Sequence, residues 1–516
     1  MAAVTTLAMS RLAGCGSSGG DADTSSAGSS EATGTETTDS SGGISTEIDM
    51  SEEPYTVAIQ VVTLPGTQFE GEAEREAAIN AITESAINCT VDIQEVWISE
   101  IANTTSMAVA GGEKVDLVHV ATVSPLSSMV GSDILYDMNT DNLLQNRGQD
   151  LETLFGDLLK SGYVNGQQLA IPAKNFNASA KGIYYNKTMA DEYGITLPET
   201  GGMDELETAL KAIHEANADV YPFYVGDGVN NYLYWLQGYE GFGQLAAYGA
   251  VLDSSADTTI ENLYASDAFK DFAMRMYNWR TLGLLPGDPT DTNTAQDYFN
   301  SSKLFAVVSD ISEKTMVDAR ASAEAAGIEV GFMQMVEPKV TNSSLTEYMW
   351  GIASNSERPD KAMDFLNYMY SNADVANILL YGLENTNYNF VEGSTDIVAI
   401  NGSYLPLFFV GGNMESIYIK SPAGEDYIEK TLAMESAAVV SPITNYMFSD
   451  ADFATEASVI NTTLLEYLPR IQNGMAESEE ATVALLDEFN QKLSASGMDD
   501  VITANQAQLD TWLAAQ

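Results

Sequence analysis

The feature that most constrains the fold of this chain is a regular alternation of strands and helices at the start of its apolar part. Runs that alternate apolar and polar residues predict strands, and apolar residues recurring every three or four positions predict helices. The expected order is strand 55–62, helix 70–88, strand 90–98, helix 99–110 and strand 115–120. An order of β-α-β-α-β is typical of a parallel sheet with helices on its faces.

The same reading extends along the chain. In helix 70–88 the expected apolar face consists of Ala78, Ile79, Ile82 and Ala86. Further elements are expected as strand 181–187, helix 203–216, strand 303–308, helix 359–370 and two helices within 479–512. These elements predict an α/β chain with more than one domain.

A lipidation motif precedes the apolar part. Residues 12–15 read Leu-Ala-Gly-Cys, which has the form of a bacterial lipobox, so we expect residues 1–15 to be a signal peptide with lipidation at Cys15. Arg11 interrupts the apolar run and departs from that pattern. Residues 16–51 hold almost no large apolar side chain before Ile44, which predicts a disordered tether. About 28 such residues reach roughly 30 Å.

Charge and cysteine content exclude several classes of function. The 74 acidic and 22 basic residues leave a net charge of -52, which argues against nucleic-acid binding and against docking on anionic lipid. No second segment reaches about 18 uninterrupted apolar residues, so we expect a membrane link through the lipid anchor alone. With Cys15 lipidated, Cys89 has no partner for a disulfide, and we expect it to be a core residue.

Enzyme signatures are missing from the sequence. It has no HExxH motif, no CxxC motif and no P-loop, and its two histidines offer little for a zinc site. Asp288, Asp291 and Asp297 lack EF-hand spacing, so helix capping explains them better than calcium. We therefore expect no catalytic residues, no cofactor and no metal.

Four short runs, in this order, resemble the extracellular solute-binding proteins of ABC importers, of the carbohydrate-binding type. They read GQQLAIP at 166–172, GIYYNK at 182–187, FNSSKLFAV at 299–307 and PDKAMDFL at 359–366. Two further runs resemble the LplA-like lipoprotein branch, namely YGLENTNY at 381–388 and the C-terminal stretch 497–512. Ser302 replaces a usual glycine, and Asn385 and Thr386 depart from the branch motif.

The resemblance implies a two-lobed, type II periplasmic-binding-protein-like fold, in which doubly wound sheets are joined by hinge strands. Placed on this chain, lobe 1 comprises 52–175 plus 337–385, and lobe 2 comprises 176–336 plus 386–516. The chain would cross between lobes near 173–177, 333–340 and 385–398. Glu337-Pro338 favours the second position because the residue before proline is extended.

Ligands in such sheets bind at the carboxyl ends of strands. The richest aromatic and polar group there is Asp227, Asn230, Tyr232, Tyr234 and Trp235, for which a buried helix face is the alternative. The other candidates follow predicted strands or crossings, and core packing is the alternative for each. They are Trp97, His119, Asn175, Phe176, Asn177, Asp310, Tyr348, Trp350, Asn387 and Tyr388.

The expected function is that of a monomeric, lipid-anchored protein on the outer face of the bacterial cytoplasmic membrane. It would capture an oligosaccharide between its lobes and deliver it to an ABC transporter permease. Two alternatives remain open at this point: the same fold binding a peptide or another polar solute, and a lipid-anchored secreted glycan hydrolase.

Overall fold

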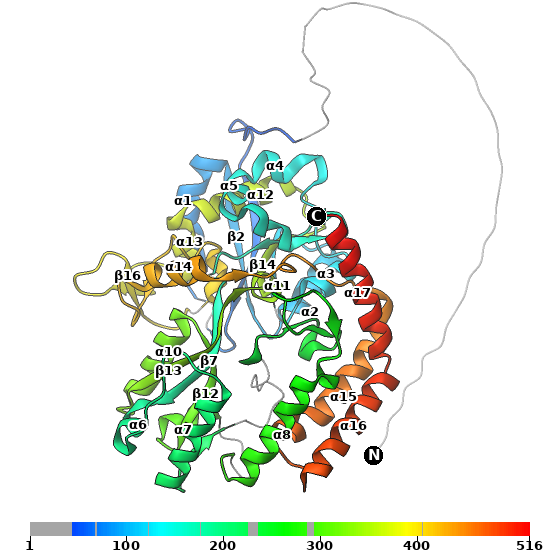
Figure 1. Cartoon of the computed structure of the whole chain (residues 1–516). Coiled ribbons are helices and arrows are strands. Elements are labelled where there is room, and N and C mark those ends of the chain that lie inside the picture. Colours follow the sequence, from blue (N-terminus) through cyan, green and yellow to red (C-terminus); the bar gives the residue numbers. More distant parts are fainter. Residues whose placement is uncertain are drawn as a thin grey trace, which may run out of the picture. The chain divides into compact units, whose positions relative to one another are not determined.

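Two five-stranded sheets organise the part of the chain that the structure describes (Figure 1). The structure is a computed structural model, and it describes residues 44–67, 70–121, 123–175, 177–224, 236–285, 294–404 and 406–516. We call the first sheet with its helices lobe 1 and the second sheet with its helices lobe 2. This arrangement is the two-sheet architecture expected from the sequence.

The sheet of lobe 1 has the strand order β2-β1-β3-β14-β6. Its strands are β1 (Tyr55–Thr63), β2 (Cys89–Trp97), β3 (Leu117–Ala121), β6 (Ile171–Pro172) and β14 (Tyr348–Ile352). The first three strands are parallel, and β14 runs antiparallel to both β3 and β6. The predicted β-α-β-α-β order is confirmed, with element ends shifted by at most two residues.

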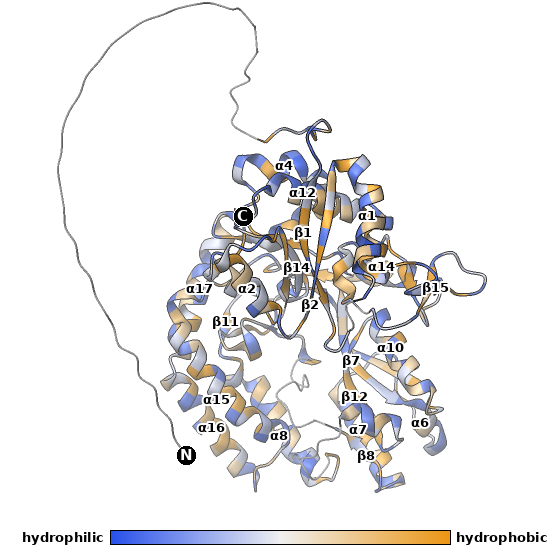
Figure 2. Cartoon of the chain, turned by 180° about the vertical axis from the view of Figure 1, so that it is seen from behind, coloured by the Kyte–Doolittle hydropathy of each residue, from blue (hydrophilic) through white to orange (hydrophobic). Residues whose placement is uncertain are grey.

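Helices cover both faces of this sheet. One face packs against α1 (Glu72–Ile87), α4 (Leu143–Arg147), α5 (Gln149–Phe155), α12 (Pro359–Ser371) and α13 (Ala373–Tyr381). The other packs against α2 (Ile101–Gly111) and α3 (Leu126–Gly131). Figure 2 shows hydrophobic residues concentrated in β1 and both colours on α1, as expected for strands between two helix layers.

The sheet of lobe 2 has the strand order β18-β13-β7-β12-β8. Its strands are β7 (Ser179–Asn186), β8 (Tyr221–Phe223), β12 (Leu304–Ile311), β13 (Val330–Val340) and β18 (Val439–Val440). The central strand β7 runs antiparallel to β12 and β13, while β8 runs parallel to β12. The carboxyl ends of β8 and β12 therefore point the same way.

Lobe 2 is also covered on both faces. The main core joins its sheet to α7 (Met203–Ala216), α8 (Asp267–Thr281) and the C-terminal helices α15 (Ala454–Gln472), α16 (Glu479–Ala495) and α17 (Met498–Ala514). The opposite face carries α9 (Ala295–Asn300) and α10 (Glu313–Glu324). Short elements complete it: α6 (Lys187–Tyr193) and a small sheet of β9 (Glu240–Gly241), β10 (Ala250–Val251) and β11 (Ile260–Glu261).

The chain passes between the sheets three times. The first passage joins β6 to β7, and the second joins β13 to β14 through α11 (Asn342–Thr346). The third follows α13 and contains several short elements. They are β15 (Tyr388–Phe390), β16 (Ile397–Ile400), the 3-10 turn η6 (Phe408–Gly411), β17 (Ile419–Lys420) and α14 (Tyr427–Ala437), which leads into β18.

Two passages differ from the sequence-based positions. β13 continues to Val340, so residues 337–340 belong to the sheet of lobe 2 and the second passage falls at 341–347. The pairing of β13 with β7 shifts register between Val336 and Lys339, and a proline is tolerated inside a strand at such a bulge. Phe409 and Val410 lie in the core of lobe 1, so this lobe extends beyond residue 385.

Candidate ligand-binding region

The three passages meet at a polar cluster. Lys174 Nζ lies 3.1 Å from Glu415 Oε1 and 3.6 Å from Glu435 Oε2, and we call these three residues the hinge triad. The backbone N–H of Asn177 donates to Glu435 Oε1 at 2.7 Å. A small apolar cluster with Ala178, Val340 and Leu345 at its centre lies at the same passages. Side chains from all three passages therefore come together in one place.

Lobe 1 presents aromatic side chains at the carboxyl ends of its strands. Trp97 is the last residue of β2, pairs with Thr63 of β1 and is partly exposed. Next to β1, the segment before η6 is held by a hydrogen bond from Leu407 N–H to Val62 O. This segment brings Phe408 and Phe409 beside the end of β1.

Tyr348 completes an aromatic cluster with these two phenylalanines. Its ring stacks on Phe409 at 4.0 Å between centroids and meets the edge of Phe408 at 5.3 Å. Tyr348 and Phe408 are partly exposed, whereas Phe409 is buried. Flat, partly exposed rings of this kind suit the C–H face of a sugar.

Lobe 2 contributes charged groups near this cluster. Asp310, at the end of β12, is exposed and forms an ion pair with Lys181 of β7. Lys314 Nζ lies 5.6 Å from the centroid of the Phe408 ring. Glu347 is exposed, yet desolvation by the surrounding protein raises the pKa of its carboxyl, and a hydrogen bond with Tyr348 opposes this rise.

His119 and Trp350 were expected near the ligand but lie in the core. Their exposed fractions are 0% and 1%, and their rings lie 3.6 Å apart between centroids. They face each other across β3 and β14, which are inner strands covered by helices on both faces. Burial lowers the pKa of His119 to about 3, so the imidazole is neutral. The sequence showed that these residues lie on strands but not how deep the strands lie.

Asn387 and Tyr388 shape a turn rather than a ligand surface. Asn387 Oδ1 accepts a hydrogen bond from the backbone N–H of Leu383 at 2.9 Å. Tyr388 is 7% exposed and packs among Tyr381, Phe390 and Tyr418. The polar and aromatic composition of this stretch therefore serves the small sheet of β15, β16 and β17.

The remaining predicted residues divide into two groups. Asn175 is partly buried and Asn177 is 5% exposed, and both lie at the first passage beside the hinge triad. The others fall outside the described residues; they are Cys15, Phe176, Asp227, Asn230, Tyr232, Tyr234 and Trp235.

Sequence reasoning missed the hinge triad, Phe408 and Phe409. The adjacent phenylalanines after Pro406 were a usable signal, since a paired aromatic in a loop seldom lacks a role. The triad gave no local signal, because Lys174 lies more than 200 residues before Glu415 and Glu435 in the sequence.

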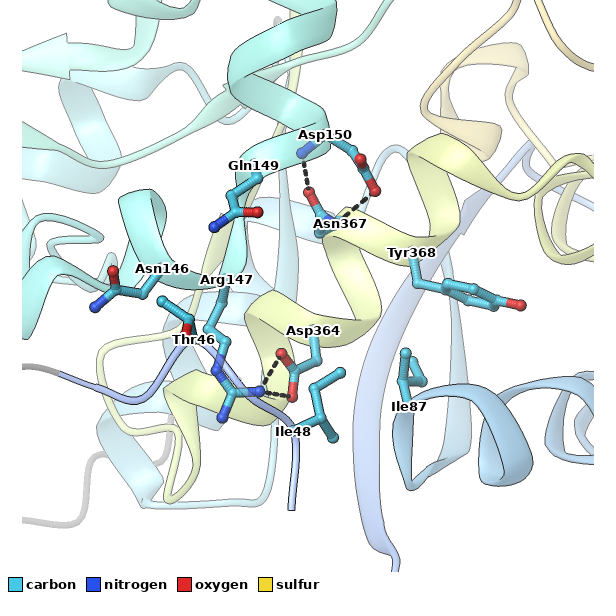
Figure 3. Close-up of a pocket in the computed structure, with 10 residues that line it drawn as sticks. All are labelled: Thr46, Ile48, Ile87, Asn146, Arg147, Gln149, Asp150, Asp364, Asn367 and Tyr368. Atoms are coloured by element: carbon cyan, nitrogen blue, oxygen red, sulfur yellow. Dashed lines mark hydrogen bonds and ion pairs between the residues drawn. The ribbon is translucent and has the colours of Figure 1, made fainter. Parts of the chain in front are cut away.

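Two recesses lie in lobe 1, and the second of them reaches Asn413 in the loop that carries Glu415. One, of about 170 Å³, lies beneath residues 44–50 near the start of β2 (Figure 3). There Arg147 binds Asp364 through both carboxylate oxygens, and Asn367 binds Asp150. The second, of about 220 Å³, adjoins it at Asp150. Their polar groups pair with each other, so we assign them a structural role.

Within the described ranges, no group of three or more His, Cys, Asp or Glu residues could hold a metal ion. Among the helices in these ranges, none combines the length and apolar character needed to span a membrane.

The two-sheet fold, with chain passages between the sheets, is that of a binding protein of the two-lobed, periplasmic type. Residues 71–376 match the model of the bacterial extracellular solute-binding protein family, and the chain belongs to this family. Residues 442–514, which cover α15 to α17, match a domain of unknown function, DUF3502.

Individual relatives agree with this assignment. A carbohydrate ABC transporter substrate-binding protein of Streptococcus pneumoniae is 24% identical over 479 residues, covering 90% of this chain and 92% of the relative. The crystal structure of the N-glycan transport solute binding protein NgtS from the same species superimposes with a TM-score of 0.75 at 21% identity, covering 89% of this chain and 99% of that one. The structure of NgtS in complex with Man5GlcNAc gives 0.61 at 21% identity, covering 90% and 99%. These likenesses establish the two-lobed fold.

Proposed function

We propose that this protein captures an oligosaccharide between its two lobes and passes it to the permease of an ABC importer. The observation that carries the proposal is the set of partly exposed aromatic rings at the carboxyl edge of the lobe 1 sheet, Trp97, Tyr348 and Phe408, with Lys314 of α10 in lobe 2 lying 5.6 Å from the Phe408 ring centroid. Aromatic faces with nearby carboxylates suit a neutral, hydroxyl-rich ligand. The relatives named for carbohydrate transport support the same choice.

The two lobes would close on the ligand by a hinge motion at the three passages. Closure is driven by ligand contacts that form with both lobes only in the closed state. We propose that the protein works as a monomer, since each chain carries both lobes, and that it binds without hydrolysing the ligand.

Titration calorimetry tests the sugar assignment. We expect binding of neutral oligosaccharides such as Man5GlcNAc and none of peptides, and a reducing-end assay should stay flat. Trp97→Ala should weaken sugar binding roughly tenfold, because it removes one stacking face. Trp512→Ala is the matched control, since Trp512 is also partly buried but lies on α17. Failure of every sugar to bind would overturn the proposal, and peptide binding or release of reducing ends would favour the alternatives.

We further propose that lipidated Cys15 anchors the protein at the outer face of the cytoplasmic membrane. The lipobox sequence and the Gly/Ser-rich stretch after it support this anchor. A tether confines the protein near its permease and raises its effective concentration there. Full-length protein should fractionate with membranes of a bacterial host, whereas Cys15→Ser protein should not; equal partitioning of both would contradict the anchor.

A further inference from the structure

We propose that Lys174 is an ionic clamp at the hinge, which stabilises the lobe arrangement seen here by pairing with one carboxylate tied to each lobe. The inference rests on the hinge motion in the proposed function. It concerns the equilibrium between lobe arrangements, which can be measured without any ligand.

Glu415 is tied to lobe 1. It follows η6, whose Phe409 and Val410 lie in the core of that lobe. Within the same loop, Asn413 Nδ2 donates to the carbonyl of Tyr370 on α12 at 3.1 Å. The loop also binds the backbone of Lys174 on both sides, through Lys174 N–H to Gly412 O and Met414 N–H to Lys174 O, each at 2.8 Å.

Glu435 is tied to lobe 2. It lies on α14, which packs against β13 and α10 and continues into β18 of the second sheet. Its Oε1 accepts the backbone N–H of Asn177 immediately before β7. A rotation of one lobe against the other therefore changes the distance between Glu415 and Glu435, with Lys174 between them.

The side chains of the hinge triad are partly buried, which strengthens the attraction between them. The side chains of Lys174, Glu415 and Glu435 are 15%, 24% and 16% exposed, so solvent screens their attraction less than that of a surface pair. The Lys174–Glu435 separation of 3.6 Å is the longer of the two and is the contact that lobe rotation would break first.

At the same place, the side-chain amide of Asn177 makes an unfavourable contribution. Neither its Oδ1 nor its Nδ2 has a hydrogen-bond partner among the described residues, although the residue is 5% exposed. A buried amide without a partner is unfavourable. The unpartnered amide of Asn177 thus makes this arrangement less favourable, whereas the ion pairs of Lys174 stabilise it.

Spin-label distance measurements on the full-length chain test the clamp. Labels at Ser85→Cys on α1 and Glu192→Cys on α6 report the distance between lobes, with Cys15→Ser added; Cys89 is buried. In Lys174→Met, we expect the fraction of molecules outside the main wild-type distance peak to be about three- to fivefold larger than in the wild type. Glu435→Gln, which keeps an oxygen for Asn177 N–H, should do the same, and the double variant should add nothing.

Lys160→Met is the control, because the Lys160–Asp157 pair is exposed and lies within lobe 1. High salt should shift the wild type toward the Lys174→Met distribution and shift that variant less than the wild type. Wild-type distances in folded Lys174→Met and Glu435→Gln would overturn the clamp. A shift in both, together with a lack of sugar binding, would keep the clamp and reject only the sugar.

Discussion

Buried polar side chains help to fix how lobe 1 packs. Arg75 and Glu95 form an ion pair with side chains 0% and 1% exposed, and the Arg75 guanidinium also lies 3.9 Å from the Tyr404 ring centroid. Burial raises the pKa of Glu95 to about 7 despite its partner. Tyr404 precedes the segment that brings Phe408 to the strand ends, so this pair also supports the proposed ligand surface.

At the scale of a single residue, the burial of His119 can also be tested through the pH dependence of stability. Burial lowers its folded-state pKa to about 3 from an ordinary value of 6.5. The unfolded chain therefore binds more protons below pH 6.5, and stability falls as the pH falls toward 3. Between pH 7 and pH 5, His119 should cost about 2 kcal/mol of unfolding free energy.

Urea unfolding at pH 7 and at pH 5 measures this loss of stability. The drop in free energy of unfolding should be about 2 kcal/mol smaller in His119→Gln than in the wild type. Equal drops in the two proteins would show that His119 accepts a proton without leaving the core.

At the scale of single elements, α1 protects the open edge of the first sheet. β2 is the edge strand, and two of its backbone N–H groups bind side chains of α1. Ile93 N–H donates to Glu76 Oε1 and Val91 N–H donates to Asn80 Oδ1, each at 2.8 Å. Glu76 and Asn80 are one helical turn apart, so a single face of α1 satisfies the edge that would otherwise invite another strand.

Glu76→Ala with Asn80→Ala should expose this edge. We expect a loss of about 2 kcal/mol in the free energy of unfolding and faster aggregation, because two backbone donors lose their partners. Urea unfolding and light scattering measure the two effects. Glu84→Ala, an exposed residue of the same helix, is the control; a double variant as stable and soluble as this control would refute the role.

At the scale of the whole molecule, charge repulsion opposes the folded state. The net charge is -52, and most cations in the described ranges are already paired with nearby carboxylates. Added salt screens repulsion between exposed charges over distances of about 10 Å at 0.1 M. The high acidity thus favours solubility at the expense of stability.

We expect the melting temperature to rise by a few degrees between about 10 mM and 200 mM NaCl. Choline chloride at equal ionic strength should give the same rise if screening is the cause. A rise with NaCl alone would indicate specific sodium binding, and a fall with both salts would show that ion pairs outweigh the repulsion.

The sequence by itself determined the order and type of the first five elements and of several later ones, because strand alternation, helical spacing and breaking residues act over a few neighbours. Runs such as 182–187 and 359–366 also indicated the family, and Cys89 is buried as expected. The face of α1 was less predictable. Its buried residues are Arg75, Ile79, Thr83 and Ile87, so Ile79 is the one buried residue among the four expected.

Only the tertiary structure decided which of these residues reach a surface. Arg75 of α1 is buried because it pairs with Glu95 of β2, and Thr83 is buried because Ile79 O and Cys89 O accept hydrogen bonds from its hydroxyl. Tyr348 and Trp350 share one face of β14, yet Tyr348 is partly exposed at the strand end while Trp350 is enclosed further along. How deeply a side chain is buried and which group it pairs with depend on contacts between distant segments. Local sequence patterns carry no information about these contacts.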